Sequence, residues 1–246
     1  MVKKSALHDA IKSRDIDAIK QILQSGNAEL EAEFEIEGRL HLRPIHYAVK
    51  YSGAETELVI GWLAEAGADL NAKSRDGSRS APDDHHVTAL YDTAGCNHIV
   101  AALALLNGRA DPNVTCFGWT PLHHAAEQNH PMMIELLASR IRVNINAKHP
   151  ENGMTPMHSA AYSGAVRACS RLWLLGADIT AKNSYGETPL ELAAAYKKQS
   201  TVAFLSQLAN TSNANEKTPQ EWGNELLKAI KAEKNRSDMP DCTHAC

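Results

Sequence analysis

The sequence predicts an all-α solenoid of stacked helix-turn-helix units, and three observations support this fold class. First, a four-residue phrase recurs six times. The copies read Ser5-Ala6-Leu7-His8, Arg43-Pro44-Ile45-His46, Thr88-Ala89-Leu90-Tyr91, Thr120-Pro121-Leu122-His123, Thr155-Pro156-Met157-His158 and Thr188-Pro189-Leu190-Glu191. Second, from the third copy onward the starts lie 32, 35 and 33 residues apart. Third, units end on Gly-Ala-Asp, as at Gly67 and Gly176. A near-constant period of this size is typical of repeat proteins, whose units bury their apolar faces only by stacking.

Each phrase predicts the start of a short helix. The Thr hydroxyl can cap free backbone N–H groups, and Pro in the first helical position sacrifices no hydrogen bond. A second apolar helix follows, and Gly then permits the positive φ of a helix C-terminus. In the fourth unit we expect Leu136, on the second helix, to be buried on both sides.

Together, the phrase, the period and the ending resemble the ankyrin-repeat family, whose signature is Thr-Pro-Leu-His-x-Ala. The copies at Thr120 and Thr155 match it best, and the resemblance covers about residues 5–208. It implies paired antiparallel helices, β-hairpin-like fingers projecting to one side, and a concave face that binds other proteins.

The expected organisation is a solenoid over residues 1–208 followed by a small C-terminal region. The six repeats have expected bounds of about 5–34, 38–73, 74–113, 114–148, 149–182 and 183–208. We expect the first repeat to be a polar cap and the sixth, with Glu191 in place of His, to be the terminal repeat. Residues 209–217 are a polar connector, 218–234 an amphipathic helix and 235–246 a flexible tail.

The segment 218–234 begins with a capping box, because Thr218 is followed three residues later by Glu221. Trp222, Leu226 and Ile230 share one face of the expected helix. We expect this face to dock on the sixth repeat and shield its open end. A second binding element, free for a partner, is the alternative.

Two repeats depart from the pattern. Arg43 replaces the Thr cap of repeat two, a loss of about 1 kcal/mol. In repeat three the ten residues Ser78–Val87 separate Gly77 from Thr88, where repeats four and five have a single residue. This insertion is polar and contains Pro, so we expect a fingertip loop without core residues, whose removal leaves folding intact.

The composition is that of a globular protein, with 43% hydrophobic residues, 22% charged residues and a net charge of −4. This slight negative balance gives no support for nucleic-acid binding. The longest apolar run, Ile99–Leu106, is too short to span a bilayer, and the first residues lack the apolar core of a signal peptide. We therefore expect the five cysteines to be reduced thiols in the cytoplasm.

Potential catalytic and metal-binding groups are better explained structurally. His46, His123 and His158 recur at one repeat position, which indicates a repeated structural hydrogen bond. The Asp83–His86 cluster and the trio Cys242, His244 and Cys246 lack structural-zinc spacing. Phosphate-binding loops, nucleophile elbows and His-Glu-x-x-His are missing from the sequence, and we expect Cys169 in the core. We therefore expect no catalytic residue, no metal and no cofactor.

The informative residues are aromatic or apolar side chains at finger and inner-helix positions. Trp and Tyr are common binding anchors, and the resemblance implies that these positions face a partner-binding groove. We expect one semi-continuous surface made of Phe117, Trp119, Met154, Tyr162 and Tyr185, with Glu127, Gln128 and Ser163 at its rim. Packing of the same side chains on neighbouring fingers is the alternative.

These features favour a non-enzymatic module that binds another protein through its concave face and is a monomer by itself. A secreted microbial effector that uses the same groove on a host protein, inside the host cell, is an alternative. A third, less favoured, is an enzyme whose site the Ser78–Val87 loop completes. The sequence does not identify the partner.

Overall fold

The computed structural model describes residues 5–26, 28–32, 34–36, 40–51, 53–75, 86–140 and 143–212. The chain divides into two compact units, Met1–His124 with Ser139–Val143 and Ala125–Ala138 with Asn144–Cys246. We call them the N-terminal and C-terminal units. Both consist mainly of short paired helices, so the helical solenoid predicted from the sequence is confirmed.

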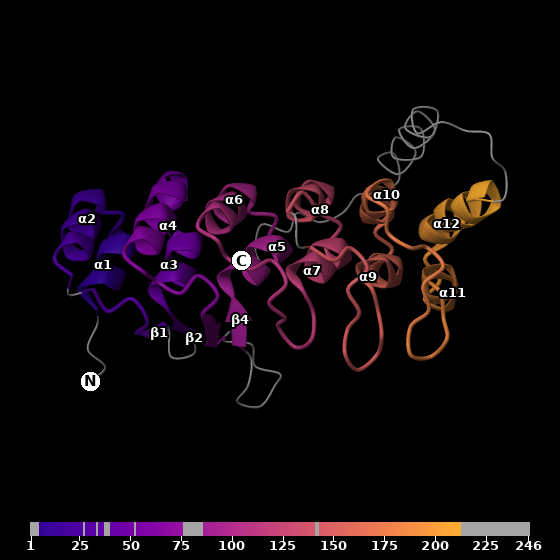
Figure 1. Cartoon of the computed structure of the whole chain (residues 1–246), viewed down its shortest axis with the longest axis horizontal. Coiled ribbons are helices and arrows are strands. Elements are labelled where there is room, and N and C mark those ends of the chain that lie inside the picture. Colours follow the sequence, from indigo (N-terminus) through magenta and orange to yellow (C-terminus); the bar gives the residue numbers. More distant parts are fainter. Residues whose placement is uncertain are drawn as a thin grey trace. The chain divides into compact units, whose positions relative to one another are not determined.

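In the N-terminal unit the helices form two layers, with the first helix of each pair in one and the second in the other (Figure 1). The first layer contains α1 (Ala6–Ser13), α3 (Pro44–Tyr51) and α5 (Ala89–Gly95). The second contains α2 (Ile16–Gln24), α4 (Thr56–Glu65) and α6 (Ile99–Asn107), with the 3-10 turn Gly53–Glu55 before α4. Each helix packs on its partner and on the equivalent helix of the next pair, which is how stacked repeats bury their apolar faces.

A four-stranded antiparallel sheet connects the first fingers of this unit. Its strands are β1 (Phe34–Ile36), β2 (Leu40–Leu42), β3 (Lys73–Arg75) and β4 (His86–Thr88), in the order β1-β2-β3-β4. β1 with β2 and β3 with β4 each form one finger, and the His41–Arg75 pair joins the two fingers. The hairpin-like fingers implied by the resemblance are therefore true strand pairs here.

The C-terminal unit repeats the helical arrangement. Its helices are α8 (Pro131–Ala138), α9 (Pro156–Ser163), α10 (Val166–Leu174), α11 (Pro189–Ala195) and α12 (Gln199–Ser212). α9 packs on α11, while α10 lies against α8 and α12. Helix α7 (Pro121–Glu127) contributes residues to both units.

Helix starts and the turns between paired helices follow local chemistry. Ser5 and Thr88 accept hydrogen bonds from backbone N–H groups of α1 and α5, and Thr188 forms a capping box with Glu191. The turn inside each pair contains a residue of positive φ: Arg14, Gly53, Asn97, Asn129, Gly164 and Lys197. Gly and Asn adopt this left-handed conformation readily, so only Arg14 and Lys197 are held in it against their residue preference.

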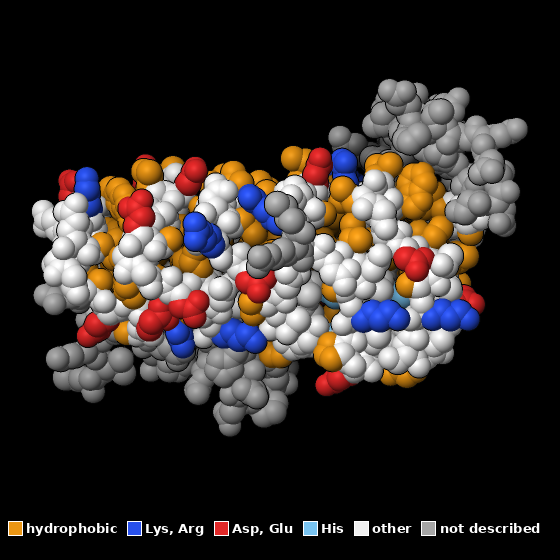
Figure 2. Space-filling view, in the orientation of Figure 1, with side chains coloured by type: hydrophobic (Ala, Val, Ile, Leu, Met, Phe, Trp, Pro, Cys, Tyr) orange, Lys and Arg blue, Asp and Glu red, His pale blue; other side chains and the backbone are white. Residues whose placement is uncertain are grey.

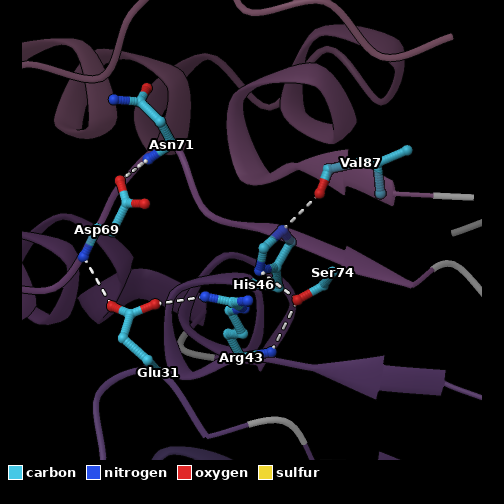
Figure 3. Close-up of polar contacts among 7 residues, drawn as sticks. All are labelled: Glu31, Arg43, His46, Asp69, Asn71, Ser74 and Val87. Atoms are coloured by element: carbon cyan, nitrogen blue, oxygen red, sulfur yellow. Dashed lines mark hydrogen bonds and ion pairs between the residues drawn. The ribbon is translucent and has the colours of Figure 1, made fainter.

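Arg43, which stands where repeats three to six have the Thr cap, contacts neighbouring repeats instead (Figure 3). The Arg43 N–H donates to Ser74 Oγ at 3.0 Å, and the Arg43 guanidinium pairs with Glu31 at 2.6 Å. The second oxygen of Glu31 accepts the Asp69 N–H at 2.8 Å. Glu31 and Arg43 therefore tie three successive chain segments together at the start of α3.

Two sequence expectations about the core are wrong. Leu136 is only half-buried, whereas Met133, Ile134 and Leu137 are fully buried, because α8 turns those three side chains inward. The sequence predicts Val87 in a loop without core residues, but Val87 is 3% exposed and belongs to β4. The inserted segment therefore ends in a core strand.

The remaining expectations on this insertion, residues 78–85, and on residues 213–246 lie outside the described residues. Across the parts of the chain that are described, no helix is both long enough and apolar enough to span a membrane.

Candidate protein-binding surface

The fourth finger presents Phe117 and Trp119 on a tight two-residue turn in the N-terminal unit. Cys116 and Trp119 exchange backbone hydrogen bonds of 2.8 and 2.9 Å around the turn. Phe117 and Gly118 both have positive φ, 56° and 83°, which is the backbone of a type I′ turn. Asn-Gly is the usual pair for such a turn, so Phe117 occupies a conformation that is strained for an aromatic residue.

This turn points the Phe117 side chain outward, where it is 44% exposed. The Trp119 ring is half-buried and meets the His123 ring edge-on, with 5.3 Å between centroids. The fourth finger therefore combines an exposed aromatic side chain with one that its own helix holds in place.

The C-terminal unit carries an exposed aromatic pair on its inner helices. Tyr162, at the end of α9, is 41% exposed and packs edge-to-face on Tyr196, with 4.5 Å between centroids. Tyr196 follows α11 and is 51% exposed. Sequence reasoning missed Tyr196, although it follows an Ala run in repeat six much as Tyr162 does in repeat five.

The fingers of the same unit add two more of the predicted residues. The Tyr185 side chain is 78% exposed. The backbone N–H groups of Tyr185 and Glu187 both donate to the side chain of Asn183, which fixes the fingertip. Met154 is half-buried on the preceding finger. Tyr185 is therefore presented by a rigid turn.

The predicted rim residues behave differently from one another. Glu127 and Gln128 are exposed at the end of α7. The Ser163 hydroxyl donates to the carbonyls of Ser159 and Ala160, both at 3.2 Å, so it is directed toward its own helix. Glu127 and Gln128 therefore offer free polar groups, and Ser163 offers mainly its small size.

Two of the recurring histidines, His46 and His158, serve as structural connectors, as predicted. Nε2 of His46 donates to the Val87 carbonyl at 2.9 Å, and its Nδ1 accepts the Ser74 hydroxyl at 3.0 Å (Figure 3). Nε2 of His158 donates to the Glu187 carbonyl at 3.0 Å, and Nδ1 accepts the Thr155 hydroxyl at 2.8 Å. Burial lowers the pKa of His46 to about 4, so the ring is neutral at neutral pH.

The buried cysteines also behave as core residues. Cys169 is fully buried, and burial raises the pKa of its thiol to about 12. Burial likewise raises the pKa of the Cys116 thiol. Reactive cysteines need the opposite shift. Among the described residues, no three His, Cys, Asp or Glu side chains lie close enough to hold a metal ion.

Charged side chains of both signs are interleaved on the face that Figure 2 shows. Acidic and basic groups both appear over the two units, and hydrophobic side chains lie among them. Nucleic-acid binding requires clustered positive charge, whereas protein interfaces combine aromatic anchors with mixed polar rims. This surface has the second character.

Comparison with known proteins gives the same family as the fold. The model of ankyrin repeats (many copies) matches residues 122–172. The chain is 32% identical to the human SH3 and multiple ankyrin repeat domains protein 2 over 192 residues, which are 74% of this chain and 10% of that protein. It is 25% identical to the mouse B-cell lymphoma 3 protein homolog over 194 residues, 78% of this chain and 40% of that protein.

A third relative is the tyrosine-protein kinase HTK16 of Hydra vulgaris, 30% identical over 65% of this chain and 22% of the kinase. The chain spans between a tenth and two fifths of the length of these three relatives. The chain belongs to the ankyrin-repeat family, whose repeats are protein–protein interaction modules.

Proposed function

We propose that this chain is a non-enzymatic adaptor that binds a partner protein through its fingers and inner helices. In the C-terminal unit the contacts are Met154, Tyr162 and Tyr185, with Glu127, Gln128 and Ser163 at the rim. In the N-terminal unit they are Phe117 and Trp119. The partner is another protein, and the chain alone is a monomer that acts in the cytoplasm.

The observation that supports this proposal most strongly is the exposed Tyr162–Tyr196 pair. Two tyrosine rings 4.5 Å apart are already ordered, so binding a partner loses little further side-chain entropy. Tyr185 and Phe117 add exposed aromatic area on rigid turns. Phe117 is held in strained backbone, and such strain is found preferentially at functional sites.

Cysteine chemistry supports the proposed compartment. Cys116 and Cys169, two buried cysteines in the described part of the chain, are free thiols. Free thiols persist in reducing compartments. Burial raises the pKa of the Cys116 and Cys169 thiols, which makes them poor nucleophiles. This supports the proposal that the chain has no catalytic cysteine.

The proposal is tested by affinity capture from extracts of the source cells, with bound proteins identified by mass spectrometry. The baits are the wild-type chain, Tyr162→Ala and, as a matched control, Met132→Ala. Met132 is 61% exposed on α8, outside the proposed contacts. A protein retained by wild type and by Met132→Ala, but depleted by Tyr162→Ala, supports the proposal. Equal recovery with all three baits contradicts it.

A further inference from the structure

Helix α10 leaves two adjacent leucines uncovered in and after its last turn. Leu174 is 41% exposed and Leu175 is 37% exposed, whereas Cys169 and Leu172 are fully buried. Figure 2 shows hydrophobic side chains at the surface over α10 and α12. These leucines lie on an outer helix, away from the fingers and from Tyr162. The helices that pack on α10, namely α8, α9 and α12, leave them exposed.

The chain itself supplies a segment that can reach these leucines. α12 packs on α10 and runs on to Ser212. α10 and α12 occupy equivalent places in successive repeats. The left-handed turn residues that precede them, Gly164 and Lys197, are 33 residues apart, so Leu208 of α12 lies at the position equivalent to Leu175. α12 therefore continues for four residues, about 6 Å, beyond the position equivalent to Leu175. Residues 213–217 span at most about 18 Å, so residue 218 starts within reach of α10.

The segment 218–234 has the pattern that such a surface requires. Thr218 and Glu221 have the spacing of a capping box, and Trp222, Leu226 and Ile230 repeat at four-residue intervals. A helix of this length is marginal in water by itself, and packing of its apolar face provides most of its stability. The short connector 213–217 is therefore long enough to bring the amphipathic segment 218–234 to the exposed end of α10.

We propose that residues 218–234 dock as an amphipathic helix on the exposed leucines of α10, in the fifth repeat, through Trp222, Leu226 and Ile230, rather than on the sixth repeat that the sequence alone suggests. The docked segment covers the outer face of the C-terminal unit in cis. This places the C-terminal segment apart from the finger surface, so the contact is independent of the proposed adaptor function and each can fail alone.

The test measures how fast a thiol reacts at position 174 in the full chain. Leu174→Cys is combined with serine at Cys96, Cys242 and Cys246, and maleimide labelling is followed by mass spectrometry. Adding Leu226→Asp breaks the docking face. The matched control is Asn224→Asp, which introduces the same carboxylate on the opposite face of the expected helix. Leu58→Cys in the same serine background, on α4 of the N-terminal unit, serves as a reference thiol because Leu58 is 50% exposed.

We expect Leu226→Asp to accelerate labelling at position 174 by about tenfold, because docking must open before the thiol reacts. Asn224→Asp should leave that rate unchanged, and the position-58 rate should be the same in all backgrounds. If position 174 is labelled as fast as position 58 both with and without Leu226→Asp, the proposal is overturned. The exposed leucines are then available to bind another protein. Protection that grows with protein concentration also overturns it, because a second copy is then the occupant.

Hydrogen exchange on the chain with all five cysteines and Leu174 intact keeps the proposal testable if the thiol variant folds poorly. Amides of α10 should exchange faster in Leu226→Asp than in Asn224→Asp. Identical exchange in the two variants contradicts docking.

Discussion

Replacing Leu137 by Ala tests the stacked core directly, because its neighbour Leu136 provides an internal control. Leu137 is fully buried in α8, between helices of the C-terminal unit, while Leu136 on the same helix is half-buried. Leu→Ala removes apolar groups worth about 2 kcal/mol of transfer free energy, and an enclosed cavity adds to that loss. We expect Leu137→Ala to lower the free energy of unfolding by about 2–5 kcal/mol.

The Leu136→Ala change should lower the same free energy by only about 1 kcal/mol, because water can fill the space left at a half-exposed site. Urea titration followed by circular dichroism measures both variants, and an unchanged m-value shows that the comparison is valid. A loss below about 1 kcal/mol for Leu137→Ala, or equal losses for the two variants, would contradict the conclusion that α8 turns Leu137 rather than Leu136 toward the core.

Three further outcomes follow from the polar contacts and the inserted segment. Burial holds His46 neutral in the fold with a pKa of about 4, whereas in the unfolded chain it takes up a proton below about pH 6.5. The free energy of unfolding should therefore fall by about 2 kcal/mol between pH 7 and 5 because of His46. In a series of melting temperatures over that pH range, His46→Gln should reduce the decrease. Thr188→Ala removes the cap of α11 and should cost about 1 kcal/mol in a denaturant titration; an unchanged midpoint would argue against the capping box. Deleting residues 78–85 should leave the melting temperature nearly unchanged, whereas extending the deletion through Val87 should lower it sharply, because Val87 is buried and its carbonyl binds His46. Equal melting curves for the two deletions would contradict the role given to β4.

Local and periodic signals allowed much of the fold to be predicted from the sequence. The Thr-Pro phrases mark the starts of α9 and α11, and the role of His46 and His158 follows from their recurrence at one repeat position. These features depend on residues a few positions apart or on the repeat period. Both are visible in a single sequence.

Features that depend on contacts between repeats were not predictable. The support of Arg43 by Ser74 and Glu31 joins residues from three repeats. The burial of Leu137 rather than Leu136 depends on the rotation of α8, which the apolar pattern does not fix because both residues are leucine. The strained φ of Phe117 arises from a finger turn that would normally carry Asn.

The candidate site was predicted as a set of positions, and the structure adds how those positions are presented. Tyr162 was identified from its place after an Ala pair, but its ring contact with Tyr196 depends on α9 and α11 lying side by side. No sequence signal gave that distance. Partner contact at these residues remains our proposal.

The most direct test of partner binding by the exposed aromatic side chains is a titration with the captured partner. Isothermal calorimetry would compare the wild-type chain with Trp119→Ala, Tyr162→Ala and the control Met132→Ala. We predict that Trp119→Ala and Tyr162→Ala each weaken binding by about 2 kcal/mol, or roughly thirtyfold in Kd, with little change in melting temperature. Met132→Ala should bind like wild type. Wild-type affinity in both aromatic variants, or a loss confined to Met132→Ala, would contradict the proposed surface.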